Sequence, residues 1–542
     1  MFMPMSENIS GPTLRRRSPR RVCQWFWTAG SMRIGLLCAT FATMAHIATA
    51  QNAPVGQPLS VIDWLDAQMS ATADPERPPE PDVTQDGTVP RVSVEPLKTS
   101  APQRIGLAPS SITGLPDNVW TTSSGARLAA QIAAMPTLRL PALQALYYKL
   151  LLAEAAPPRI AADAFDMARI TALAELGALD AALALMEQTG PGKMPEQFAR
   201  YMDLSLLAGT QARACKMMQA RPDLAPGHAH IVFCLARDGD WNTAALVLDT
   251  ARALDLIPAL SADALARFLD VELFEGDPPL PLPARPDPLL FRLYDAIGTP
   301  IPARIWPLVY ANADLADTAG WKAQVEAAER LAQSGALADN RLLGLYTKRQ
   351  PAASGGVWDR IAALQHFETA LRMRNPAAVS KTLPAAWRIM RAARLAVPFA
   401  NLFARDLTAL ALPEDAQDAA FEVILLSDHY TRAAQIFPER ARQRPDLAAV
   451  ATGDIPQDVP AEPVSQAVSA AFRAAPPDTA LVTLAQTGAL GHALLNTLAL
   501  TDAGGKGDIN QLVTGLATLR ALGFEDVARR AALQVLLLGR LS

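Results

Sequence analysis

The chain has 542 residues, of which 50% are hydrophobic but only 6% aromatic. Its 49 basic and 53 acidic residues give a net charge of −4, which excludes the strongly basic footprint typical of nucleic-acid-binding proteins. The chain is longer than one ordinary compact core, and its abundance of Ala and Leu favours close-packed helices over sheets.

The N-terminal residues have the pattern of a secretory signal peptide. Met32-Arg33 precede an apolar run over residues 34–48, and residues 48–50 read Ala-Thr-Ala. The run is shorter than the roughly 20 residues of a membrane span, so we expect export to the periplasm and no stable span after cleavage. Residues 1–50 are therefore a signal peptide with an upstream extension. Translation starts at Met1 or Met32, and Arg20-Arg21 leave a twin-arginine signal open.

Residues 51–118 combine a short amphipathic helix with a Pro-rich linker. The helix covers residues 59–69, and its apolar residues lie on or near one face: Ile62, Trp64, Leu65 and Met69. The Pro-rich sequence of residues 71–116 predicts an extended, disordered linker. The helix either packs on its own chain or docks on a partner, and the sequence does not separate the two.

Helical periodicity begins near residue 119, and repeated turns follow. The first three turns have glycines 32 and 30 residues apart, each with Ala five positions later: Gly177 with Ala182, Gly209 with Ala214, and Gly239 with Ala244. Two more have glycines 35 residues apart: Gly488 with Ala493, and Gly523 with Ala528. Such spacing predicts stacked helical hairpins, in which Gly permits the tight turn and Ala permits close packing of the second helix. We expect Leu179 and Trp241 to fill the closed ends of their hairpins.

The stretch from Gly239 to Leu256 carries a family resemblance. Its sequence, GDWNTAALVLDTARALDL, resembles the second-helix half of a tetratricopeptide repeat, with matches at Gly239, Asp240, Trp241, Ala244, Ala251 and Pro258. The resemblance implies helical hairpins that stack into a solenoid with a concave binding surface. The Ala-rich tracts are also similar to those of exported proteobacterial proteins, some labelled antifreeze-like, but the chain shows no regular Thr array.

Two Pro-rich breaks divide the predicted helical body. The expected segments are tetratricopeptide-like repeats over 119–275, a break at 276–288, a helical segment over 289–450, a break at 451–463, and C-terminal repeats over 464–542. The predicted fold class is all-α, an irregular α-solenoid of helical hairpins.

Cys215 and Cys234 are the cysteines that remain after the leader. An isolated pair in an oxidising compartment is a disulfide candidate, whereas two buried unpaired thiols are the alternative. The first lies in the second helix of the Gly209 unit and the second in the first helix of the Gly239 unit. These helices are expected to be antiparallel neighbours, and the register places both cysteines at the same height. We therefore predict a disulfide.

No stretch of the sequence carries a convincing catalytic or cofactor motif. His228 and His230 form a close pair in or near a loop, without the third ligand that catalytic zinc needs. The glycine-rich residues 504–507 lack the phosphate-loop pattern and predict a flexible turn. We predict no enzyme activity, metal or cofactor.

The expected function is therefore that of a periplasmic scaffold that binds a protein or peptide partner, in envelope assembly for example. The alternative is a cell-wall enzyme or glycan-binding protein built on an α-superhelix. Clustered carboxylates and exposed aromatics in a cleft would favour this alternative.

Overall fold

A computed structural model describes residues 103–455 and 462–539. The chain divides into two units, Met1–Val94 and Glu95–Ser542, and every described residue belongs to the second. The predicted signal peptide and the helix with Ile62, Trp64, Leu65 and Met69 lie outside the described residues. Within the described ranges the fold is all-α, and β-type pairing is limited to two isolated bridges. Among these residues no helix is both long and apolar enough to cross a membrane.

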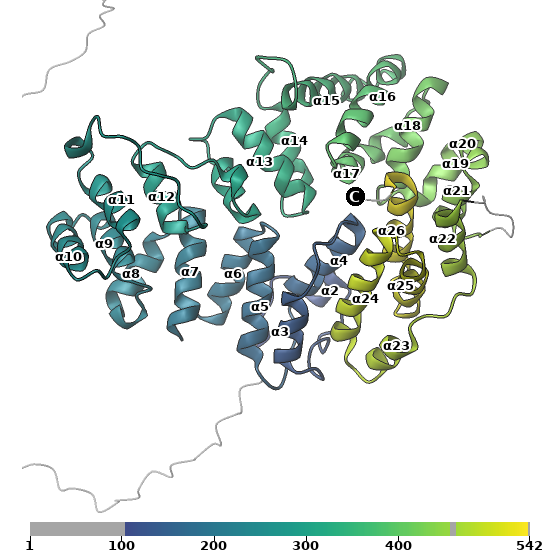
Figure 1. Ribbon diagram of the computed structural model, residues 1–542. Coiled ribbons are helices and arrows are strands. Elements are labelled where there is room, and N and C mark those ends of the chain that lie inside the picture. Colours follow the sequence, from purple (N-terminus) through teal and green to yellow (C-terminus); the bar gives the residue numbers. More distant parts are fainter. Residues whose placement is uncertain (1–102, 456–461, 540–542) are drawn as a thin grey trace, which may run out of the picture. The chain divides into compact units, whose positions relative to one another are not determined.

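The helices follow one another in short hairpins, with η marking 3-10 helices (Figure 1). The first are α2 (Ser110–Thr113), α3 (Gly125–Ala133), α4 (Pro141–Leu152), α5 (Ala162–Glu175), α6 (Leu179–Thr189), α7 (Pro195–Ala208), α8 (Ala212–Ala220) and η1 (Pro222–Leu224). Next come α9 (His228–Arg237), α10 (Trp241–Ala253), α11 (Ala259–Leu269), η2 (Glu272–Phe274), α12 (Pro288–Ala296), η3 (Ala303–Ile305) and η4 (Leu308–Leu315).

The second half of the chain continues in the same way. Its first helices are α13 (Trp321–Gln333), α14 (Asp339–Thr347), α15 (Val357–Arg372), α16 (Pro376–Ala392), α17 (Ala396–Leu407) and α18 (Glu414–Leu425). They are followed by η5 (Tyr430–Arg432), α19 (Ala433–Ile436), α20 (Pro438–Gln443), α21 (Pro445–Thr452), α22 (Pro463–Arg473), α23 (Thr479–Gln486), α24 (Leu490–Gly505), α25 (Ile509–Ala521) and α26 (Glu525–Leu538).

The five glycines of the sequence repeat lie in the turns between paired helices. All have left-handed backbone, with φ of +85° at Gly177, +74° at Gly209, +93° at Gly239, +90° at Gly488 and +89° at Gly523. The alanines five residues later are completely buried: Ala182, Ala214, Ala244, Ala493 and Ala528. A side chain larger than Ala at these positions would separate the two helices of a hairpin.

The two residues that we expected to fill the closed ends of their hairpins differ in exposure. Leu179 is 2% exposed, as expected, whereas Trp241 is 48% exposed. The prediction for Trp241 is wrong, because its ring is half exposed and does not fill the closed end of the α9–α10 hairpin. The centroid of the Trp241 ring lies 6.2 Å from that of Phe268 in α11.

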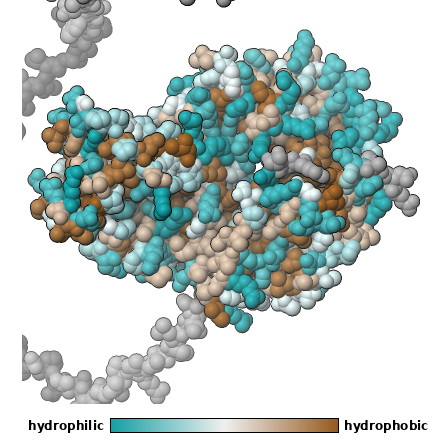
Figure 2. Space-filling model, viewed as in Figure 1, coloured by the Kyte–Doolittle hydropathy of each residue, from teal (hydrophilic) through white to brown (hydrophobic). Residues whose placement is uncertain are grey.

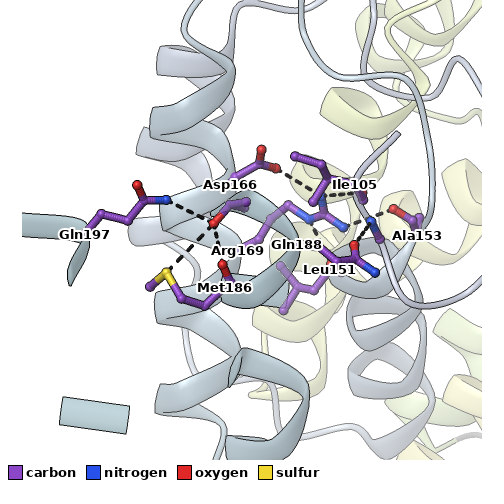
Figure 3. A network of polar contacts seen from close by, with 10 residues as sticks. Ile105, Leu151, Ala153, Asp166, Arg169, Met186, Gln188 and Gln197 are labelled. Carbon is purple, nitrogen blue, oxygen red and sulfur yellow. Dashed lines mark hydrogen bonds and ion pairs between the residues drawn. The ribbon is translucent and has the colours of Figure 1, made fainter. Parts of the chain in front are cut away.

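The predicted disordered linker ends earlier than residue 118. Residues 103–118 are ordered and anchored by Arg169, which is 1% exposed (Figure 3). The Arg169 guanidinium donates to the carbonyl oxygens of Ile105, Leu151 and Ala153 at 2.8–3.0 Å, and it pairs with Asp166 at 3.2 Å. The prolines do not prevent this packing, because main-chain carbonyls supply the contacts and Leu115 is buried.

The C-terminal helices pack against the N-terminal ones. α26 and α24 both contact α4, and α24 also contacts α3 (Figure 1). In an open solenoid each hairpin contacts only its neighbours in the chain. The described residues therefore form a closed circuit of helix contacts, which the predicted solenoid did not include.

Two side chains complete this closure at the N-terminus of α4. Leu140, the N-cap residue, provides no side-chain cap. Instead the Arg139 N–H donates to Oδ1 of Asp502 in α24 at 2.7 Å, and the Ala142 N–H donates to Oε1 of Gln534 in α26 at 2.9 Å. Asp502 is 1% exposed, and its Oδ2 lies 2.7 Å from the Lys506 ammonium.

Several hairpin turns are also hydrogen-bonded to one another. Ser334 Oγ donates to the Leu176 carbonyl at 2.8 Å, and Asn312 Nδ2 donates to the Gly177 carbonyl at 2.9 Å. Gln333 Nε2 donates to the Ala393 carbonyl at 2.8 Å. The α5–α6, α13–α14 and α16–α17 turns thus meet around one region.

Asp502→Ala should weaken the contact between α24 and the start of α4. The substitution leaves the Arg139 N–H without its acceptor, which costs about 1–3 kcal/mol in the free energy of unfolding. Amide hydrogen exchange across residues 141–152 should accelerate, and Asp502→Asn should restore most of the protection because it keeps an acceptor oxygen. Asp508→Ala is the matched control, since Asp508 caps only its own helix α25. Unchanged exchange in α4 of the Asp502→Ala protein would contradict the closure.

Candidate functional site

The two cysteines join the hairpins in the repeat region. Cys215 in α8 and Cys234 in α9 form a disulfide with an S–S distance of 1.99 Å and a Cα–Cα distance of 5.3 Å. Both residues are buried. The bond crosses between adjacent helices connected through η1, which is the arrangement that the repeat register predicts.

Replacing both cysteines by serine should lower the free energy of unfolding by about 3 kcal/mol, because the disulfide closes a loop of roughly 20 residues in the unfolded chain. Urea unfolding with and without reductant measures this difference. The reduced native chain should lose a similar amount, whereas the double Ser variant should not respond to reductant. In the protein without residues 1–50, two titratable thiols after unfolding without reductant would contradict the bond.

The helix after this disulfide has little of its surface buried. α10 buries only the narrow stripe of Ala244, Leu248 and Ala251. Leu246 and Leu254, which are 67% and 62% exposed, lie off that stripe. α9 and α11, which both contact α10, bring Phe233 and Phe268 together with ring centroids 5.6 Å apart.

Exposed apolar side chains are concentrated in this part of the chain. Of twelve large hydrophobic residues that are exposed within the described ranges, seven lie between positions 241 and 282. We call them the α10–η2 surface: Trp241, Leu246, Leu254, Leu256, Val271, Leu273 and Leu282. Figure 2 shows hydrophobic areas over the α9–α12 region, at the left of the view. Large exposed apolar patches commonly mark sites of interaction.

A cluster of ionisable groups lies where α7, α9 and the start of α12 approach one another. Burial raises the pKa of Asp203 to about 6, although Arg200 opposes the shift, and the charge of Asp287 adds to it. Burial lowers the pKa of His230. His228 and His230 lie in the first turn of α9, next to the loop that precedes this helix. Among the described residues no three His, Cys, Asp or Glu side chains group closely enough to hold a metal.

Asp203→Asn should stabilise the protein at neutral pH. A carboxyl with a raised pKa favours folding when it is protonated, so its contribution is complete below about pH 4 and is lost as pH rises through about 6. The side chain is only partly buried, and we expect a gain of about 1–3 kcal/mol at pH 7.5 that disappears at pH 4. Thermal unfolding across this range, with Asp249→Asn at an exposed position of α10 as control, measures the effect. A gain independent of pH would contradict it.

The meeting point of the hairpin turns contains a cavity of about 770 Å³. Its walls come from the α3–α4 connection, α4, α5, η4, α13, the α16–α17 turn and the end of α26. The charged residues of the lining are four arginines and one glutamate: Arg139, Arg330, Arg391, Arg394 and Glu175. The lining therefore carries a net charge of three positive, in a chain whose net charge is −4.

The sequence analysis missed both the cavity and the α10–η2 surface. The cavity arginines are spread over residues 139–394, so no local motif joins them. The sequence does contain a signal for the α10–η2 surface. Leu246 and Leu254 do not share the helical face of Ala244, Leu248 and Ala251, which are the buried residues of α10. Of the glycine-rich residues 504–507, only Lys506 and Gly507 form a turn. Gly504 and Gly505 belong to α24, and a Cβ on Gly504 would lie 2.4 Å from Leu512.

Comparison with known proteins does not place the chain in a family. It matches no protein-family model, no curated protein and no solved structure.

Proposed function

We propose that the chain is a non-enzymatic, exported helical-repeat protein that binds a protein or peptide partner. Tetratricopeptide-like hairpins supply the frame, and the α10–η2 surface makes the contact. The observation that carries the proposal is the concentration of large, exposed apolar side chains on one edge of the helical array.

The α10–η2 surface suits a partner with apolar anchors. Burying apolar area gains about 25 cal/mol per Å², so Leu246, Leu254 and Leu273 together offer several kcal/mol to a partner that covers them. Trp241 belongs to a residue type that is frequent at the energetic centre of interfaces. Its ring is held against Phe268 and loses little freedom on binding.

Export is supported by the chemistry of the cysteines. A disulfide between Cys215 and Cys234 is typical of an oxidising compartment such as the periplasm. The predicted leader over residues 1–50 agrees with this location.

The lining of the cavity supports binding over glycoside hydrolysis. Glycosidases commonly use two carboxyl groups that flank the scissile bond. Glu175 is the single carboxylate among the described lining residues, and Ser334 already donates its hydroxyl to the Leu176 carbonyl. Among the described lining residues there is thus no pair of carboxylates.

Site-specific photo-crosslinking in the native cell tests the proposal. A crosslinking amino acid at Leu246 or Leu273 should form one discrete adduct that is lost when Leu254→Glu is also present. Ile160 is the matched control position, since it is 72% exposed and lies outside the α10–η2 surface. Equal adducts from Ile160, or none from either surface position, would contradict the assignment.

A further inference from the structure

We propose that the cavity between the hairpin turns binds an uncharged small molecule that carries an amide group on an apolar body. This site is separate from the α10–η2 surface and does not depend on the function proposed for that surface. The inference stands on two buried polar side chains of α4 that line the cavity without a hydrogen-bond partner, and on the apolar walls around them.

Gln144 and Tyr147 present polar groups to the cavity from one face of α4. They are three residues apart, so their side chains project from the same side of the helix. Gln144 is 5% exposed and Tyr147 is 3% exposed, and both line the cavity. Neither the Gln144 amide nor the Tyr147 hydroxyl forms a hydrogen bond with a described residue, and neither is among the polar atoms that are shut off from solvent. Their polar groups therefore open onto the cavity.

The Gln144 amide lies next to another wall of this space. A Cβ on Gly335, in the turn between α13 and α14, would lie 3.9 Å from Gln144 Oε1. Ser334 of the same turn belongs to the cavity lining. The amide is therefore held between α4 and the α13–α14 turn, within reach of a ligand in the cavity.

Gln144 differs from the other buried glutamines of the described chain. Gln197, Gln324 and Gln365 donate their amide N–H groups to oxygen atoms at 2.7–3.0 Å, and Gln534 accepts a main-chain N–H at 2.9 Å. Buried polar groups in folded proteins are nearly always hydrogen-bonded, because an unpaired group is costly. A ligand that pairs with the Gln144 amide supplies the missing partner.

The arginines of the lining do not require a charged ligand. Arg330 donates to two main-chain carbonyl oxygens at 3.2 Å, and Arg391 pairs with Glu422 at 3.1 Å. Arg139 and Arg394 also have interaction partners. The guanidinium groups are thus already engaged, whereas the unpartnered groups on α4 are neutral.

The Tyr147 hydroxyl is a neutral donor. Burial raises the pKa of this hydroxyl above its ordinary value of 10.0, and the negative charge of Glu175 adds to the shift. The hydroxyl therefore keeps its proton at physiological pH and can donate it to a ligand oxygen. The charge of Glu175 also disfavours a carboxylate head beside Tyr147.

An amide group matches these two partners. It has an acceptor oxygen and an N–H donor, so it can pair with the Gln144 amide through one N–H···O bond in each direction. The Tyr147 hydroxyl can then donate to the second lone pair of the ligand oxygen. An alcohol offers a single hydroxyl, and a carboxylate offers no donor at all.

The remaining walls fit an apolar body. They include Ile132, Met135, Leu138, Leu308 and Val397. A volume of about 770 Å³ lies within the range of cavities that hold small-molecule ligands. An amide without an apolar chain would leave these walls uncovered, so the ligand is expected to bury apolar surface here.

Titration calorimetry with the full chain tests the site. Octanamide and N-methyloctanamide carry a primary and a secondary amide, whereas octanoate and octan-1-ol keep the same carbon chain with a carboxylate or a hydroxyl. We expect at least one amide to bind about tenfold more tightly than octanoate and octan-1-ol, because only the amide satisfies both groups on α4. Its affinity should not change as salt is added, since the ligand is uncharged.

Two variants remove the polar groups with little change in size. Gln144→Met and Tyr147→Phe should each weaken amide binding about tenfold, because the ligand loses a hydrogen bond in a buried site. Neither should lower the unfolding temperature of the free chain, since the removed group has no partner there. Tyr148→Phe is the matched control and should bind like the wild-type protein, because its hydroxyl donates to the Leu176 carbonyl and lies outside the lining.

Three results would overturn the proposal. The first is that neither amide binds, or that octanoate or octan-1-ol binds as tightly. The second is equal amide affinity of the wild-type protein and both the Gln144→Met and Tyr147→Phe variants. The third is a clear fall in the unfolding temperature of these two variants, because their polar groups would then be structural.

Discussion

The N-terminus of α4 is the point on which the closed arrangement depends. The helix begins without a side-chain cap of its own. The N–H of Arg139, just before the helix, donates to Asp502, and the N–H of Ala142 in its first turn donates to Gln534; these acceptors lie 363 and 392 residues away in the chain. A buried carboxylate is costly unless it is paired and hydrogen-bonded. The positive end of α4 and the Lys506 ammonium supply both conditions for Asp502. The C-terminal helices α24 and α26 therefore supply hydrogen-bond acceptors to the start of α4, near the beginning of the described chain.

The contacts between the C-terminal and N-terminal helices also determine which groups the hairpin turns contact. In an open array the turns face solvent, and water satisfies their carbonyl groups. Here the turns near Gly177, Ser334 and Ala393 face one another, and side chains of neighbouring hairpins donate to their carbonyls. The same convergence brings the arginines of distant helices to one cavity. A cavity lined by arginines from distant helices is thus a consequence of closing the array.

The repeat turns and the disulfide could be predicted because their causes are local. A glycine that ends one helix, an alanine five residues later, and the register of adjacent hairpins all appear within about 60 residues of sequence. The partners of α4 could not be predicted, since nothing near Arg139 indicates Asp502. Residues 103–118 were predicted as linker for the same reason: their prolines are visible in the sequence, whereas the distant Arg169 that anchors them is not.

The disulfide explains how the edge of the array tolerates its exposed apolar residues. α8 and α10 bury mainly small or slender side chains, namely Ala214, Cys215, Met218, Ala244, Leu248 and Ala251. Burial this sparse gives little stability, and a cross-link compensates by restricting the unfolded chain. The leucines of the α10–η2 surface are then not required for the core. The cross-link therefore adds a restraint in the part of the array that carries these exposed leucines.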